Sequence, residues 1–257
     1  MSGLKLKYNT SCKYEICLDE VGRGPLFGRV YIGAVILPSI SNNNTVDSNN
    51  NNTKIIPIID NPKNSKKEVS YKDIKDSKKF SSKKKIKDVS DFIREKCPLY
   101  AIHYADAEII DDINILQSVY KCMHSCIREL IEKIKELDPT FDIRKDIQIL
   151  VDGDRFKPYC MFDENTESII QIPHETIEKG DATYMGIAAA SIIAKVEHDE
   201  YISNLCIQYP ELNIRYGLEK NVGYGTKQHM NGIRQYGITQ WHRKSYGPCK
   251  ECEYSPL

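Results

Sequence analysis

The sequence lacks an excess of charge of either sign, and it lacks any long hydrophobic run. Its 257 residues contain 36 basic and 36 acidic side chains. No overall positive field attracts nucleic acid, so such a partner would have to be held by local patches. No segment approaches the uninterrupted apolar length of a membrane span, and the first ten residues lack the apolar core of a signal peptide. We therefore expect a cytoplasmic protein with no membrane partner.

A disulfide framework and a complete zinc site are also missing. The nine cysteines are odd in number and irregularly spaced, unlike the paired cysteines of small secreted proteins. Cys249 and Cys252 form a single C-x-x-C pair, and two thiols alone do not complete a tetrahedral zinc site. The length suits one domain, or one domain with a small appendage.

The stretch ICLDEVGRGPLFG places polar chemistry at the end of an apolar run. Residues 16–18 predict a strand that delivers Asp19 and Glu20 into a glycine-rich turn. Two adjacent carboxylates are costly to bury, and a divalent cation would offset that cost. The glycines of residues 22–24 let the backbone approach a ligand, and the arginine between them suits phosphate. The combination indicates metal-assisted phosphodiester chemistry, although a turn with solvated acids explains these few residues equally well.

Hydrophobic patterning predicts an alternation of strands and helices along the rest of the chain. We expect strands at 30–37, 99–104, 147–151 and 168–172, the first of them forming a hairpin with the strand before Asp19. We expect helices at 82–96 (capped by Ser81 or Ser82), at 107–138 as one or two helices, and at 182–202. Residues 39–71, rich in Asn and Lys, predict a loosely attached insertion, with weak edge pairing at 55–59.

Two further acids each lie next to a glycine, and the first of them resembles Asp19 in following an apolar strand. Asp152 ends the strand at 147–151 and precedes a glycine, and Asp181 precedes the helix at 182–202. For Asp181 the pattern fits a helix N-cap and a functional acid equally well.

The chain from residue 209 onwards is polar, with basic and aromatic side chains interleaved. Its basic groups suit phosphates and its aromatic rings suit sugars or bases, while some of the rings must anchor the tail to the core. The side chains concerned are Lys220, Lys227, His229, Arg234, His242, Arg243 and Lys244, among Tyr216, Tyr224, Tyr236 and Trp241. We expect His124, earlier in the chain, to pack in or near the core.

Taken in order, these pieces resemble the type 2 ribonuclease H family, ribonuclease HII. Each motif alone is a weak signal, but their common order over almost the whole chain outside the insertion makes coincidence a poor explanation. They are DEVGRGPLFG at 19–28, DSKKF at 76–80, EIIDDINILQS at 108–118, LVDGDR at 150–155, KGDATYMGIAAASIIAKV at 179–196, GYGTKQH at 223–229 and HRKSY at 242–246.

The resemblance implies an α/β protein with a ribonuclease H-like fold. Its mixed five-stranded sheet would be flanked by helices in a catalytic core at 1–208, followed by a small helical C-terminal extension at 209–257 that contributes to substrate binding. It further implies an endoribonuclease that cuts the RNA strand of RNA/DNA hybrids, and single ribonucleotides in duplex DNA. The reaction would use two divalent ions, Mg²⁺ or Mn²⁺, and leave 5′-phosphate and 3′-hydroxyl ends.

The resemblance also assigns residues to roles. The catalytic and metal-binding carboxylates would be Asp19, Glu20, Asp152 and Asp181. The substrate-binding residues would be Gly22, Arg23 and Gly24, which read the ribose 2′-hydroxyl, together with Lys78 and Tyr224, whose ring stacks on the neighbouring deoxyribose. Because Asp19 and Glu20 are consecutive, they can share a site only if the strand bends at its end. We expect the protein to act as a monomer.

The chain departs from the family pattern at three places and leaves rival interpretations open. Val222 and His198 stand where the family often has lysine and arginine, and Asp154 where it often has asparagine. We therefore expect activity with weaker binding or an altered metal preference.

One rival interpretation is a non-catalytic hybrid-binding module, which would lack one of the four acids, and none is missing. Type 3 ribonuclease H usually has an N-terminal binding domain, whereas about fifteen residues precede the first strand here. A catalytic subunit that needs partners stays open, although the compact C-terminus favours the single-chain form.

Overall fold

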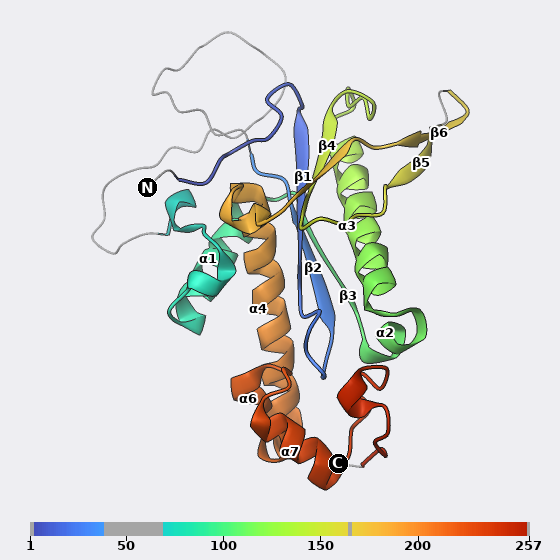
Figure 1. The fold of residues 1–257 in the computed structure, drawn as a ribbon. Helices are drawn as coiled ribbons and strands as arrows, with labels where there is room; N and C mark the ends of the chain where they lie inside the picture. The colour runs from blue at the N-terminus through green and yellow to red at the C-terminus, as the bar shows by residue number, and fades with distance from the viewer. Residues whose placement is uncertain (1–2, 39–68, 164–165, 256–257) are drawn as a thin grey trace.

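The computed structural model describes residues 3–38, 69–163 and 166–255, and a five-stranded sheet runs through its centre (Figure 1). The sheet has the order β3-β2-β1-β4-β7. β2 runs antiparallel to β1 and β3, and β4 runs parallel to β1 and β7. The strands are β1 (Tyr14–Val21), β2 (Val30–Val35), β3 (Tyr100–Ala105), β4 (Ile147–Asp152) and β7 (His174–Ile177). The predicted α/β class, the mixed five-stranded sheet and the hairpin are thus confirmed.

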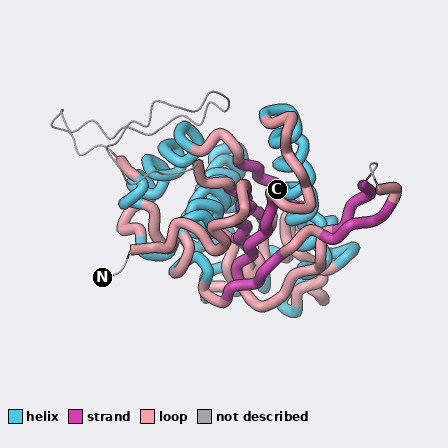
Figure 2. The backbone as a smooth tube through the Cα atoms, turned by 90° about the horizontal axis from the view of Figure 1, so that it is seen from above, coloured by secondary structure: helices cyan, strands magenta, loops and turns pink. Residues whose placement is uncertain are grey.

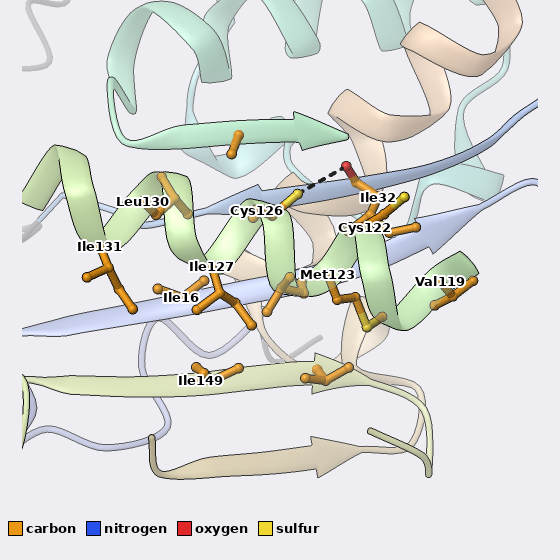
Figure 3. Close-up of a cluster of buried hydrophobic side chains, with 14 of the residues drawn as sticks. Ile16, Ile32, Val119, Cys122, Met123, Cys126, Ile127, Leu130, Ile131 and Ile149 are labelled. Atoms are coloured by element: carbon orange, nitrogen blue, oxygen red, sulfur yellow. Dashed lines mark hydrogen bonds between the residues drawn. The ribbon is translucent and has the colours of Figure 1, made fainter. Parts of the chain in front are cut away.

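One face of the sheet is covered by α3 (Ile115–Leu137), which follows the short helix α2 (Ala107–Ile113). Apolar residues of α3 recur at helical spacing and pack on Ile16, Ile32 and Ile149 of the strands (Figure 3). The Cys126 thiol lies 3.7 Å from the carbonyl oxygen of Ile32 and donates to it. The predicted helical stretch that ends before Pro139 is therefore two helices.

The opposite face is covered by α4 (Met185–Gln208), with α1 (Lys83–Lys96) packed beside it (Figure 1). The contact is close because glycines face the helix and the helix carries small residues. A Cβ at Gly33 would lie 2.2 Å from the carbonyl oxygen of Ala190, and a Cβ at Gly186 would lie 2.4 Å from the Cys17 sulfur. Small residues therefore bring this helix directly against the sheet. The predicted cap is also confirmed, since the Ser82 hydroxyl accepts from the Lys85 amide at 3.3 Å.

The chain after α4 forms short helices that pack at one end of the molecule (Figure 1). They are α5 (Pro210–Tyr216), α6 (Leu218–Asn221), α7 (Lys227–Tyr236) and the 3₁₀ turn η4 (Gly247–Cys249). Their apolar side chains form one cluster with Leu26 and Phe27 of the β1–β2 turn and with Ile202 of α4. The helical C-terminal extension therefore shares a core with the turn that follows Asp19 and Glu20.

Several details differ from the expectations or lie outside what is described. β6 (Ser168–Gln171) pairs with β5 (Cys160–Asp163) in a separate ribbon that projects from the body (Figures 1 and 2), and the fifth strand of the sheet is β7, which the patterning did not predict. Residues 39–68 of the predicted insertion, including the pairing proposed at 55–59, lie outside the described residues. Within the described part of the chain, no helix is both long and apolar enough to cross a membrane.

Candidate active site

Asp19 and Glu20 lie within strand β1, which continues to Val21. The sequence analysis placed them in the turn that follows the strand. Together with Asp152 they line a pocket of about 380 Å³. Asp19 is buried and sits opposite Gly33 of β2. Neighbouring strand residues point to opposite faces, yet at this end of β1 both carboxylates reach the same pocket. The sequence prediction that the two acids share one site is consistent with this placement.

Asp19 is held by a short chain of hydroxyl groups. The Ser191 hydroxyl of α4 hydrogen-bonds to its carboxylate, and one carboxylate oxygen also accepts from the Glu20 amide at 2.7 Å. Ser191 in turn lies 3.0 Å from the hydroxyl of Ser77, which belongs to the 3₁₀ turn η2 (Ser77–Lys79). Helix α4 and the DSKKF motif therefore both fix the position of this acid. The sequence analysis did not assign a role to these two serines. The available signal for Ser191 was a hydroxyl group on an otherwise apolar face of α4.

Asp152 lines the pocket, whereas Asp181 lies beside it and is not one of its lining residues. Asp152 ends β4, and its carboxylate accepts from the Gly180 amide at 2.6 Å, which ties β4 to the 3₁₀ turn η3 (Gly180–Ala182). Asp181 lies in that turn and pairs with Lys78 at 3.8 Å. The N-cap residue of α4 is Tyr184, so the capping role considered for Asp181 is wrong. A turn of 3₁₀ helix before α4 moves the acid away from the cap and towards the other carboxylates.

Burial and neighbouring charges raise the pKa values of three of the acids, Asp19, Glu20 and Asp181. Burial, followed by the charges of Asp152 and Glu20, raises the pKa of Asp19 well above its usual range. Burial also raises the pKa of Glu20, against the opposing effect of Arg23, and burial together with the charge of Asp152 raises the pKa of Asp181. Desolvation opposes the charge on Lys78, but the surrounding acids, Asp181 first, still raise its pKa. Burial is thus the first cause of each raised carboxyl pKa, and the charge of a neighbouring acid adds to it.

The donor set fits a divalent cation in its chemistry. Carboxylate oxygens are the preferred protein ligands of hard cations such as Mg²⁺ and Mn²⁺, and a cation would offset the burial and repulsion that raise the pKa values of these acids. Within the described ranges, no three acid, histidine or cysteine side chains already converge tightly enough to hold a metal ion. Several of these carboxylates hold other partners here, namely Arg23 for Glu20 at 3.1 Å, the Gly180 amide for Asp152 and Lys78 for Asp181.

The turn at residues 22–24 borders the same pocket, and so does Tyr224. Gly22 has φ +92°, and a Cβ there would lie 2.9 Å from both the Arg29 carbonyl oxygen and the His198 ring. Only glycine fits this position. Gly24 has an ordinary φ and lies against the ring of Tyr224, whose Cε1 would be 3.4 Å from an added Cβ. Tyr224 is 46% exposed, so one part of its ring is free for another contact.

The aromatic and basic tail divides into exposed and buried parts, and the buried part corrects the sequence reading. His229, His242, Arg243 and Tyr216 are buried, so the expectation that the first three neutralise phosphates is wrong. The Thr239 amide donates to Nδ1 of His242 at 2.9 Å, so the proton of His242 is on Nε2, which donates to Nε2 of His229 at 3.1 Å. Nδ1 of His229 then donates to the Tyr224 carbonyl at 3.0 Å.

The residues at which the chain departs from the predicted family pattern take different positions. His198 is buried on α4 and lines the pocket. Its Nδ1 lies 3.0 Å from Asp199, and its Nε2 has no hydrogen-bond partner among the described residues. Val222 ends α6 with φ +44°, an uncommon conformation for a β-branched residue. Asp154 is exposed beside Arg155.

His124, which we expected to pack in or near the core, is half-buried, and its Nε2 bonds to the Lys157 carbonyl.

The comparisons with known proteins agree with these motifs. The family model described as Ribonuclease HII matches residues 59–249, which include Asp152 and Asp181, while Asp19 and Glu20 lie before the match. The ribonuclease HII of Christiangramia forsetii is 35% identical over 228 residues, which cover 89% of this chain and 87% of the relative. That alignment spans most of both chains.

Solved structures share the fold at low sequence identity. The crystal structure of the ribonuclease H2 from Pyrococcus horikoshii has a TM-score of 0.56 and 20% identity, covering 93% of this chain and 96% of the other. Bst-RNase HIII in complex with Mn²⁺ has a TM-score of 0.55 and 18% identity, covering 94% of this chain and 70% of the other. Because both types fit almost equally well, the fold does not separate type 2 from type 3, whereas the family model and the sequence relative do.

Proposed function

The chain belongs to the ribonuclease HII family. We propose that the pocket bordered by its carboxylates is the site at which it hydrolyses RNA that is paired with DNA. The chain is an endoribonuclease of RNA/DNA hybrids, as the family is, and its activity depends on divalent metal ions. Cleavage at single ribonucleotides within duplex DNA is consistent with the family. The observation that carries the assignment of the site is that Asp19, Glu20 and Asp152 line one pocket with the turn at residues 22–24.

We assign Asp19, Glu20, Asp152 and Asp181 as the residues that hold the metal ions, which we propose to be Mg²⁺ or Mn²⁺. When bound, such ions neutralise the negative charge of the pocket and of the scissile phosphate and supply Lewis-acid chemistry. The raised pKa values of Asp19 and Asp181 support this assignment, since burial and the charge of Asp152 raise both, and a bound cation would offset these effects. The Mn²⁺ complex of a structural neighbour supports the choice of a divalent metal ion.

The protein's own groups then position the substrate. Ser191 and the Glu20 amide hold the Asp19 carboxylate, and the Gly180 amide holds that of Asp152. Lys78 and Arg23 border the acids and can pair with phosphate oxygens once the carboxylates take other partners.

We propose that the turn at residues 22–24 recognises the ribose 2′-hydroxyl, the group that distinguishes RNA from DNA. Tyr224 lies against Gly24 and exposes part of its ring, which supports a stacking role on the next sugar. This is how the extension at 209–257 would contribute to substrate binding. The monomeric state and the cytoplasmic location stay predictions.

Cleavage assays test the proposal directly. The wild-type protein is offered a long RNA/DNA hybrid, a DNA duplex with one ribonucleotide and an all-DNA duplex, each in Mg²⁺, Mn²⁺ and EDTA. We expect cleavage of the first two duplexes with either metal, and none in EDTA. Asp19→Asn should abolish cleavage while it leaves hybrid binding nearly intact. Substantial turnover by Asp19→Asn would refute the ligand assignment.

Asp154→Asn is the matched control. It removes the same charge from an exposed acid that lies two residues after Asp152 and pairs only loosely with Arg155, at 3.7 Å. We expect it to keep activity within a few-fold of the wild type. If the two variants lost activity equally, general charge loss near the pocket would explain the result, and the special role of Asp19 would be wrong.

A further inference from the structure

Arg243 is completely buried, and its guanidinium group donates only to oxygen atoms near one turn. Nη2 donates to the Gly22 carbonyl at 2.7 Å, Nη1 to the Arg23 carbonyl at 3.0 Å, and Nε to the Gly28 carbonyl at 3.0 Å. A buried cation requires such partners, because an unsatisfied charge is costly away from water. The side chain therefore binds the start and the end of the β1–β2 turn at once.

Neighbouring groups of the C-terminal segment hold the same turn. The Tyr246 hydroxyl donates to the Arg23 carbonyl at 2.6 Å and lies 3.1 Å from Nη1 of Arg243. The Arg243 amide donates to the Leu26 carbonyl at 2.8 Å, and the Gly28 amide donates to the Trp241 carbonyl at 2.8 Å. This segment is more than 200 positions away in the sequence, so nothing local fixes the turn in this way.

These bonds determine which way the peptide groups of the turn face. In a trans peptide the carbonyl and the following amide point in opposite directions, and the structure contains no cis peptide among its described residues. With the carbonyls of Gly22 and Arg23 held by Arg243, the amides of Arg23 and Gly24 point away from it. Arg23 and Gly24 are exposed and line the pocket, so these amides are available to a ligand there.

We propose that Arg243 is a positioning residue that sets the turn at residues 22–24 in the orientation in which it recognises ribose. The inference rests on the proposed function of that turn. Arg243 does not line the pocket and bonds to none of the four acids, so its loss acts on discrimination between ribose and deoxyribose through the backbone. A residue with a merely structural role would change stability and leave this discrimination unchanged.

The test measures binding of the full-length protein to two labelled DNA duplexes that differ in a single 2′-hydroxyl, in EDTA, by fluorescence anisotropy. The readout is the ratio of the two Kd values. We expect Arg243→Met to lower this ratio on the order of tenfold, because several hydrogen bonds are lost together. Arg243→Lys keeps the charge but cannot reach all three carbonyls, and should fall between Arg243→Met and the wild type.

Two more variants keep the test decisive. Tyr246→Phe removes one hydrogen bond to the Arg23 carbonyl and leaves no cavity behind. It should lower the ratio of the Kd values a few-fold, and it serves as the test if the Arg243 variants do not fold. Leu212→Ala removes a buried apolar side chain from the same C-terminal cluster but removes no hydrogen bond to the turn. It should lower stability and keep the wild-type ratio.

The outcomes separate the inference from the proposed function. A wild-type ratio in folded Arg243→Met, or in Tyr246→Phe if the former does not fold, would overturn the inference, as would an equal loss in Leu212→Ala. A wild-type protein that cuts the hybrid but binds both duplexes equally would also overturn it. Failure of the wild-type protein to cut the hybrid would instead overturn the proposed function.

Discussion

Replacement of Gly22 by alanine is the sharpest test of how the turn beside the acids is built. Gly22 has φ +92°, and its carbonyl is held by Arg243. An added Cβ would lie 2.9 Å from the Arg29 carbonyl oxygen, which belongs to the backbone and cannot rotate away. The substitution therefore forces the turn to change its path.

The expected cost follows from two contributions. Left-handed backbone costs a residue with a Cβ about 1–2 kcal/mol, and overpacking against fixed atoms costs roughly 1–3 kcal/mol. We expect Gly22→Ala to lower the free energy of unfolding by roughly 2–5 kcal/mol, and the melting temperature by about 5–15 °C. Gly24→Ala is the matched control, since its φ is ordinary and its nearest neighbour would be at 3.4 Å. It should change the free energy of unfolding by less than about 1 kcal/mol.

Urea denaturation of both variants in EDTA measures this difference. The unfolding transition is monitored by circular dichroism and by the fluorescence of the single tryptophan, Trp241. Trp241 is a suitable probe because its carbonyl accepts from the Gly28 amide at the end of the turn. If Gly22→Ala unfolded at the same urea concentration as Gly24→Ala, the strain derived from the backbone would be wrong.

Three further predictions concern pH, metal and substrate. Burial, with a further contribution from His229, lowers the pKa of His242 to about 3, whereas an unfolded histidine titrates near 6.5, at about its ordinary value. The unfolded state thus binds protons first, so stability should fall as the pH drops from about 6.5 towards 3. Melting curves should show a smaller loss between pH 7.5 and 5 for His242→Asn, and a wild-type melting temperature that is flat over this range would contradict the reasoning. Asp19→Asn should melt at a higher temperature than the wild type in EDTA at pH 7, because it removes a carboxyl group whose charged form is disfavoured by burial and by its acidic neighbours; an equal or lower value would count against this reasoning. Tyr224→Ala should reduce cleavage at a single ribonucleotide more than cleavage of a long hybrid, with Tyr224→Phe close to wild type, and equal losses on both substrates would exclude the stacking role.

Much of the fold could be predicted from local patterns. The hairpin of β1 and β2, the cap at Ser82 and the helix α3 each follow from short-range chemistry, namely apolar runs, a hydroxyl before a helix and a helical repeat. β7 was missed because His174–Ile177 is short, polar and at an edge, and only its pairing with β4 makes it a strand. The same tertiary context placed β6 in a separate ribbon.

The site was predictable only in part, for the same reason. Asp19, Glu20 and Asp152 could be recognised as carboxylates that follow apolar strands and lie close to glycine. Their supports came from distant segments, namely Ser77 and Ser191 for Asp19, and Arg243 for the turn. Histidines and arginines in a polar tail indicate a solvent-exposed basic surface, and only the packing of the extension shows that His229, His242 and Arg243 are internal.

Helix α4 has a mechanical consequence for substrate selection. Its first turns pack beneath the sheet with Ile187 and Ala190, and its last turns join the C-terminal cluster through Ile202 and Leu205. One continuous helix thus joins the sheet that carries Asp19 and Asp152 to the C-terminal extension that carries Tyr224. Under the roles proposed for these residues, a duplex that reaches both the acids and Tyr224 has to fit the spacing that this helix sets.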